Sequence, residues 1–214
     1  MPFKIVSAPA TAPISLDQAK AHLRVVDGDE DDLITALIDA AVDSCENYTG
    51  LAMINQTIDC YFDCFPFGHR WGYPHARHDH HHHDFKLPRG PLLELSGIFY
   101  TDMSGAEQTW DASNYKVDDA SPHARISLAN GKSWPTTVAH QLNAVRIRFR
   151  AGYIDDAFCP PVGSVPAGLI AAMKLTLAHW YANRESVASA GALGVVPQSA
   201  QFLMQQKRAD LGMA

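Results

Sequence analysis

The residues best suited to chemistry in this 214-residue chain are the histidines of one short stretch. Seven of the 11 histidines fall in the loop 69–84, which also contains glycine and proline. Neutral imidazole is a good ligand for zinc, nickel or copper, and His78, His80 and His82 are candidates for chelating one ion. A dedicated metal site needs fixed geometry and supporting partners, which such a loop does not promise. The composition therefore favours adventitious metal binding, with a metal-binding protein or a metal-dependent enzyme as the alternative.

No other segment supplies the parts of a catalytic site. Gly131-Lys132-Ser133 looks like the end of a phosphate-binding loop, but Ile126 stands where that pattern needs a glycine. A hairpin turn at Asn130-Gly131 explains these residues better. The sequence has no nucleophile elbow, zinc-protease motif, dinucleotide-binding glycine pattern or C-x-x-C pair. It predicts a protein that is not an enzyme and uses no cofactor.

Two groups of charged residues are candidates for contacts between molecules. Arg146, Arg148 and Arg150 alternate with apolar residues, so a strand would place all three guanidinium groups on one face. That face is either a solvated outer surface or a contact for an acidic neighbour, such as the cluster at 29–32 in a second copy. The members of this acidic cluster are Asp29, Glu30, Asp31 and Asp32.

The acidic cluster stands at the start of a predicted helix. Negative charge there compensates the positive end of the helix dipole, which explains the cluster fully. The alternative is a functional role, in which the acidic cluster lines a ring of subunits and repels DNA that passes through it. Both interpretations remain open at the level of the sequence.

The composition is that of a folded protein without an excess of positive charge. Hydrophobic residues make up 47% of the chain, charged residues 19%, and the formal net charge is −6. This balance argues against a protein that coats nucleic acid, and it suits a surface past which DNA slides without sticking. Four scattered cysteines do not form a disulfide framework. Without a secretion signal or a membrane-spanning run, we expect synthesis in the cytoplasm and no membrane partner.

Hydrophobic periodicity predicts helices at both ends of the chain and strands in the middle. The expected helices span 15–25, 29–49, 166–185 and 199–209. The expected strands span 54–65, 92–100, 115–117, 125–128 and 144–149. The predicted fold class is α+β: mainly a helical bundle, with an inserted antiparallel β subdomain. The predicted parts are N-terminal helices at 1–51, the β insert with the histidine-rich loop at 52–150, and C-terminal helices at 151–214.

Several motifs follow one another along the chain: ISLDQAKAHLR (14–24), DEDDLI (29–34), ENYTG (46–50), LPRGP (87–91), FRAGY (149–153) before Val165-Pro166, AHWYANRE (178–185), and Val196-Pro197 with Lys207-Arg208. Taken in order, they resemble the motifs of the gp6-like head–tail connectors of tailed bacteriophages, in particular the longer members of the phiE125 gp8 type. The resemblance extends from about residue 14 to residue 208, and the histidine-rich stretch departs from it.

The resemblance implies a structural adaptor in the virion neck, similar to the adaptors of gene transfer agents. Such a protein docks under the portal, joins with copies of itself in a twelvefold ring, and extends the DNA channel without sequence-specific DNA binding. The ring presents the surface on which the tail, or a stopper protein, assembles. The C-terminal segment of such adaptors commonly reaches the portal. The residues expected to dock there are Phe202, Leu203, Lys207 and Arg208.

Overall fold

A computed structural model describes residues 2–9, 11–66, 84–137, 139, 141–153, 164–184 and 197–208. The chain divides into two compact units. The β unit comprises Met1–Ala8 and Asn55–Gly152, and the helical unit comprises Pro9–Ile54 and Tyr153–Ala214. The sequence analysis assigned the whole N-terminal segment, 1–51, to the helices, whereas the structure places its first residues with the strands.

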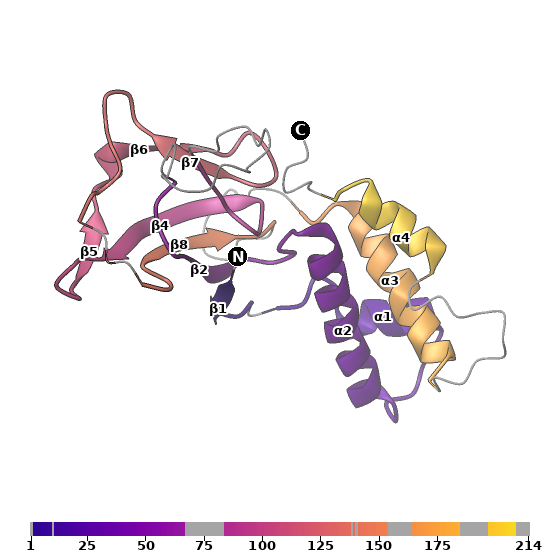
Figure 1. Ribbon diagram of the computed structural model, residues 1–214. Coiled ribbons are helices and arrows are strands. Elements are labelled where there is room, and N and C mark those ends of the chain that lie inside the picture. The colour runs from indigo at the N-terminus through magenta and orange to yellow at the C-terminus, as the bar shows by residue number, and fades with distance from the viewer. Residues whose placement is uncertain are drawn as a thin grey trace, which may run out of the picture. The chain divides into compact units, whose positions relative to one another are not determined.

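The helical unit contains α1 (Leu16–Leu23), α2 (Asp31–Thr49), α3 (Ala167–Ala182) and α4 (Gln198–Gln205). Figure 1 shows α2 and α3 side by side, with α4 packed against α3. The Ser15 side chain caps α1 by accepting a hydrogen bond from the Gln18 amide at 3.2 Å, and serine is among the residues preferred at this position. Gly50 ends α2 in the left-handed conformation, at φ 71°, where a glycine has no steric penalty.

The core of the helical unit forms where the apolar faces of its helices meet. Ile34 and Ile38 of α2 are buried with Leu169 and Met173 of α3, and Met204 of α4 joins them. Burying a side chain of this size stabilises a fold by about 1.5–3 kcal/mol. The remaining fully or nearly buried apolar residues are Ile14, Ala19, Ala41, Cys45, Leu51, Met53, Ile54, Val165, Ala172, Leu177 and Ala200.

The β unit contains two antiparallel sheets, of five and of three strands. The first has the order β1 (Phe3–Ser7), β2 (Gln56–Phe62), β8 (Val145–Ala151), β4 (Leu92–Thr101) and β5 (Glu107–Trp110). The second has the order β3 (Asp84–Lys86), β7 (Arg125–Leu128) and β6 (Tyr115–Asp118). Figure 1 shows β8 between β2 and β4, at the centre of the first sheet.

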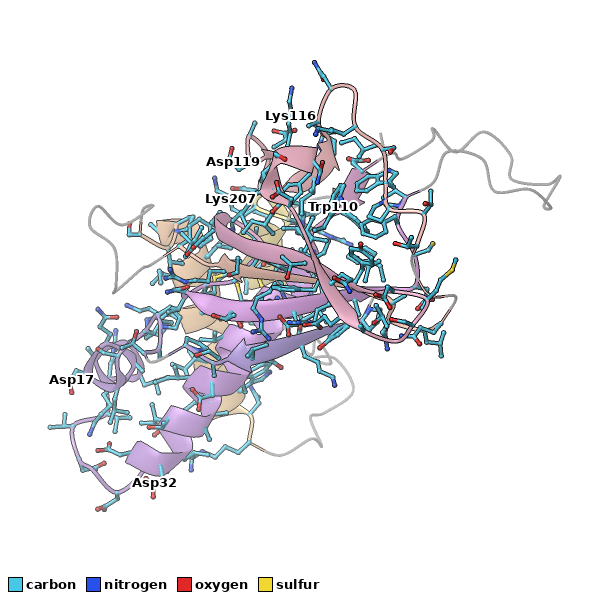
Figure 2. All side chains as sticks on the ribbon, turned by 90° about the vertical axis from the view of Figure 1, so that its left-hand side faces the viewer. Asp17, Asp32, Trp110, Lys116, Asp119 and Lys207 are labelled. Atoms are coloured by element: carbon cyan, nitrogen blue, oxygen red, sulfur yellow. The ribbon has the colours of Figure 1, made fainter. Side chains whose placement is uncertain are left out.

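Alternation along the central strands gives the five-stranded sheet one apolar face and one polar face. On the apolar face, Ile58 lies opposite Phe149 and Cys60 lies opposite Ile147; all four are fully buried. Aromatic rings extend this core. Figure 2 labels one of them, Trp110, whose ring centroid lies 5.0 Å from that of Trp134 and 5.4 Å from that of Phe65.

The prediction of a mainly helical bundle is wrong. Of the described residues, 33% are helical and 29% lie in strands, in two antiparallel sheets. The sequence analysis missed β1, β3 and β5, and α1 and α4 have only eight residues each. The alternation in β1 covers only Phe3, Lys4 and Ile5 before Val6 interrupts it, which is shorter than the four to eight residues that mark a strand in a sequence.

The helices of the described segments are all too short or too polar to cross a lipid bilayer.

Candidate functional site

The polar face of the five-stranded sheet carries the most developed charge network in the described part of the chain. The three arginines predicted to share a face do so on β8, where Asp59 lies opposite Arg148 and Tyr61 lies opposite Arg146. Carboxylates from neighbouring strands complete the network. We call this surface the arginine face and define it by Lys4, Asp59, Tyr61, Glu94, Phe99, Glu107, Arg146, Arg148 and Arg150.

Asp59 is the centre of the arginine face. Its carboxylate accepts two hydrogen bonds from Arg148, each of 2.7 Å, and lies 3.5 Å from Nη1 of Arg146. The side chain of Asp59 is only 5% exposed. The hydrogen bonds from Arg148, followed by the charges of both arginines, lower the pKa of Asp59 below its usual range. A fork-to-fork pair of this kind is among the stronger polar contacts in proteins.

The other two arginine contacts spread across the sheet. Nη2 of Arg146 donates to both carboxylate oxygens of Glu107, at 2.9 and 2.8 Å, and the guanidinium carbon lies 4.4 Å from the ring centre of Phe99. Nη1 of Arg150 lies 3.2 Å from a carboxylate oxygen of Glu94. Each predicted arginine therefore has an acidic partner within its own β unit. Contact with the acidic cluster of a second copy stays a prediction.

Two members of the acidic cluster also have partners within their own unit. Glu30 lies 2.6 Å from Arg184, which follows α3, and accepts a hydrogen bond from the Tyr181 hydroxyl. The bonds from Arg184 and then Tyr181 lower the pKa of Glu30. Asp31 pairs with Lys20 of α1 at 2.6 Å. These contacts join the start of α2 to α1 and to the end of α3, so they do more than compensate the helix dipole.

The exposed face of α2 carries an acidic row that the sequence analysis did not single out. Asp32, Asp39 and Asp43 are exposed, and their spacing of seven and four residues places them on one side of the helix. Figure 2 shows Asp32 at the surface of this helix. Within the described segments none of the three has an ion-pair partner. The periodic spacing of the three aspartates was a signal that could have identified this row.

The acidic surplus of the chain belongs to the helical unit. Its sequence contains 13 acidic and six basic residues, a net charge of −7. The β unit contains ten acidic and eleven basic residues, a net charge of +1. The exposed α2 row is thus part of a unit with a net negative charge, whereas the charges of the arginine face largely neutralise one another.

The four predicted docking residues lie on or just after α4. Met204 is buried, whereas Phe202 on another side of this helix is 62% exposed. Leu203 is half-buried against the helical core. Lys207 and Arg208 are exposed, and the Arg208 guanidinium lies 5.7 Å from the ring centre of Tyr48. Phe202 and Lys207 are therefore accessible to a partner, and Leu203 and Arg208 are partly engaged with the helical unit.

The candidate metal ligands His78, His80 and His82 lie outside the described residues. Within the described ranges, no three histidine, cysteine, aspartate or glutamate side chains are grouped so that they could hold a metal ion. Burial raises the pKa of the Cys45 and Cys60 thiols to about 12, which leaves both protonated and poorly reactive. The described part of the chain therefore gives the metal hypothesis no support.

Comparison with known proteins identifies the fold. Residues 13–64 match the family model for the phage gp6-like head-tail connector protein, which confirms the resemblance over that region. No curated protein matches the sequence significantly.

Solved structures match over the full length. A chain from the neck of an empty gene transfer agent (GTA) particle, computed with C6 symmetry, has a TM-score of 0.72 and 21% identity, covering 100% of this chain and 98% of that chain. A chain from the virion of a native GTA particle has a TM-score of 0.71, and one from the neck of a native GTA particle, computed with C12 symmetry, has 0.68. Both are 20% identical and give the same two coverages. This chain therefore has the fold of those particle chains, in both of its units.

Proposed function

We propose that this chain is a structural head–tail connector, or adaptor, of a tailed phage or phage-like particle. The observation that carries the proposal is the agreement of two independent comparisons. The N-terminal region matches the connector family, and the whole chain has the fold of neck chains from GTA particles. The C6 and C12 symmetries of those necks support assembly of this chain into a ring, of twelve subunits, at the head–tail interface.

The distribution of charge suits a ring through which DNA passes. The helical unit carries the acidic surplus, and the α2 row of Asp32, Asp39 and Asp43 faces solvent without ion-pair partners in the described segments. DNA carries about one negative charge per 1.7 Å of its length, so a wall of carboxylates repels it and prevents sticking. We assign the channel lining to this side of α2, with Asp29 and Asp32 at its start. DNA would then pass without sequence-specific contacts.

The C-terminal helix is the proposed contact for the portal. Short amphipathic helices commonly bind by placing an apolar side chain in a groove. Phe202 is the exposed apolar residue of α4, and Lys207 and Arg208 follow it with positive charge. The tail or a stopper protein would then bind the ring from its other side.

Replacing Phe202 with alanine is expected to weaken binding of the purified portal by about tenfold or more, the usual effect of removing an aromatic anchor from an interface. Val26→Ala is the matched control, because Val26 is an apolar residue of the same unit and is 96% exposed. Affinity is measured by biolayer interferometry, and circular dichroism checks that both variants fold. Equal affinities for the two variants would show that α4 does not dock through Phe202.

The function itself is tested in the particle. Deleting the coding sequence is expected to leave heads that package DNA but carry no tails, visible by electron microscopy, and expression of the intact protein restores tails. Complete, tailed particles in the deletion strain would refute the proposal.

A further inference from the structure

Both outer strands of the five-stranded sheet are open edges in the described part of the chain. Strand β1 bonds only β2, and β5 bonds only β4. On β1, the apolar residues Phe3, Ile5 and Val6 are 36%, 47% and 51% exposed. Natural proteins usually protect such edges, because an open edge with apolar side chains pairs readily with another strand. A bulge between Ile5 and Ser7 limits the regular part of this edge to Phe3–Ile5.

The two edges present matching faces. On β1, Lys4 lies opposite Asp59 on the polar face, and Phe3 and Ile5 lie opposite Cys60 and Ile58 on the apolar face. On β5, the carboxylate of Glu107 reaches Arg146 on the polar face. Strand alternation places Thr109 with Glu107, and Gln108 and Trp110 on the apolar face. If β1 of one copy continued the sheet beyond β5 of another, Phe3 and Ile5 would extend the apolar face of that sheet, and Lys4 would extend its polar face.

Charge favours pairing of β1 with β5 over pairing of two β1 strands or of two β5 strands. Lys4 is exposed, and the side chain of Glu107 is 58% exposed although it binds Arg146. Two β1 strands paired with each other would bring Lys4 beside Lys4 or close to it, and two β5 strands would do the same with Glu107. Like charges on adjacent strands destabilise a pair, and opposite charges stabilise it. A contact between β1 and β5 is the combination that joins opposite charges.

We propose that β1 of one subunit binds the β5 edge of the next, over Phe3–Ile5 and Gln108–Trp110 with Lys4 opposite Thr109, and that this contact links neighbouring subunits of the ring. The inference deepens the proposed connector function and rests on it. A contact between two different surfaces of the same chain is head-to-tail, and repetition of such a contact about an axis closes into a ring. A symmetric contact through one surface would stop at a dimer.

Cysteine cross-linking tests the contact in the full-length protein. The background carries Cys64→Ser, because Cys64 is exposed, and Cys159→Ser, because Cys159 lies outside the described residues. With Lys4→Cys and Thr109→Cys together, mild oxidation of concentrated protein is expected to give a ladder of covalent oligomers on a non-reducing gel. Lys4→Cys alone or Thr109→Cys alone is expected to give monomers. A dimer from Lys4→Cys alone would show symmetric β1 pairing and overturn the inference.

A second pair of variants covers the apolar part of the contact. Ile5→Glu is expected to lower the ring population at a given concentration by tenfold or more, with a thermal midpoint that stays close to that of the unmodified protein. Leu142→Glu is the matched control, because Leu142 is 79% exposed and lies in the loop before the central strand β8. Rings that form without the ladder, or that tolerate Ile5→Glu, would refute the β1–β5 contact and leave the connector function standing. Absence of rings from the unmodified protein at every concentration would count against the connector function itself.

Discussion

Replacing Asp59 with alanine is expected to lower the free energy of unfolding by about 2–3 kcal/mol at neutral pH, the largest effect we expect on the arginine face. The substitution leaves the guanidinium of Arg148 without its two 2.7 Å hydrogen bonds and removes a charge partner of Arg146. Removing one partner of a fully buried ion pair lowers the free energy of unfolding by more than this. We expect a smaller loss because Arg148 is 38% exposed and water partly replaces its partner.

The same variant has a defined pH dependence. Since Arg148 and Arg146 lower the pKa of Asp59 in the folded state, the carboxylate stabilises the fold above its unfolded pKa, near 3.8. This contribution is lost as the pH falls through the folded-state pKa. The difference in stability between the unmodified protein and Asp59→Ala should therefore be constant near neutral pH and shrink at acidic pH.

Urea unfolding followed by tryptophan fluorescence measures this difference, because Trp110 and Trp134 lie in the core of the β unit. Glu94→Ala is the matched control. Its side chain is 55% exposed and pairs with Arg150, so we expect a loss of about 1 kcal/mol or less. If the two substitutions cost the same, Asp59 is not the centre of the network.

Replacing Gly90 with alanine is expected to destabilise the β unit by about 3 kcal/mol or more, at the upper end of the range for overpacking. A Cβ atom at this position would lie 1.6 Å from the carbonyl oxygen of Pro122 and 2.7 Å from its carbonyl carbon. Both atoms belong to the backbone, so relief requires the chain around Pro122 to move. Gly90 lies in the LPRGP motif, and the structure supplies the reason why that motif holds a glycine.

Gly168→Ala is the control, and it is expected to stabilise the protein. Gly168 lies in the first turn of α3, and a Cβ atom there would have no neighbour within 4 Å. Alanine has the higher helix propensity, so we expect a gain of about 0.5–1 kcal/mol. Thermal unfolding of both variants, followed by circular dichroism, shows whether each substitution raises or lowers the stability. A neutral Gly90→Ala would show that the chain at Pro122 shifts without cost.

Local sequence signals predict the parts of the fold that local interactions determine. Ser15 lies directly before α1, Gly50 lies directly after α2, and the buried apolar residues of α2 recur at intervals of three and four, so each signal lies within a few residues of the feature that it defines. Strand β8 was predicted from its alternation, which the structure reproduces as alternating burial. In each case the neighbouring residues carry enough information to define the element.

Pairing between distant segments was beyond the reach of these signals. Asp59 is one of the polar residues that alternate with apolar residues along its strand, and nothing local distinguishes it from the others, yet the structure shows it to be 3% exposed. It is buried because β2 pairs with β8, which places Arg148, 89 positions along the chain, directly opposite. The contact of Glu30 with Tyr181 and Arg184 depends in the same way on the packing of α2 against α3. Two of the family-like motifs thus meet in space.

The connector proposal depends above all on closed assembly of this chain. The most direct test is mass photometry with negative-stain electron microscopy of the concentrated, purified protein, in metal-free buffer and with zinc, each with and without the portal. We predict closed rings with a central hole in metal-free buffer, with the same subunit number when zinc is present. Monomers in every metal-free sample, together with a defined oligomer only in zinc, would contradict the proposal and make the histidine-rich loop the functional centre of the protein.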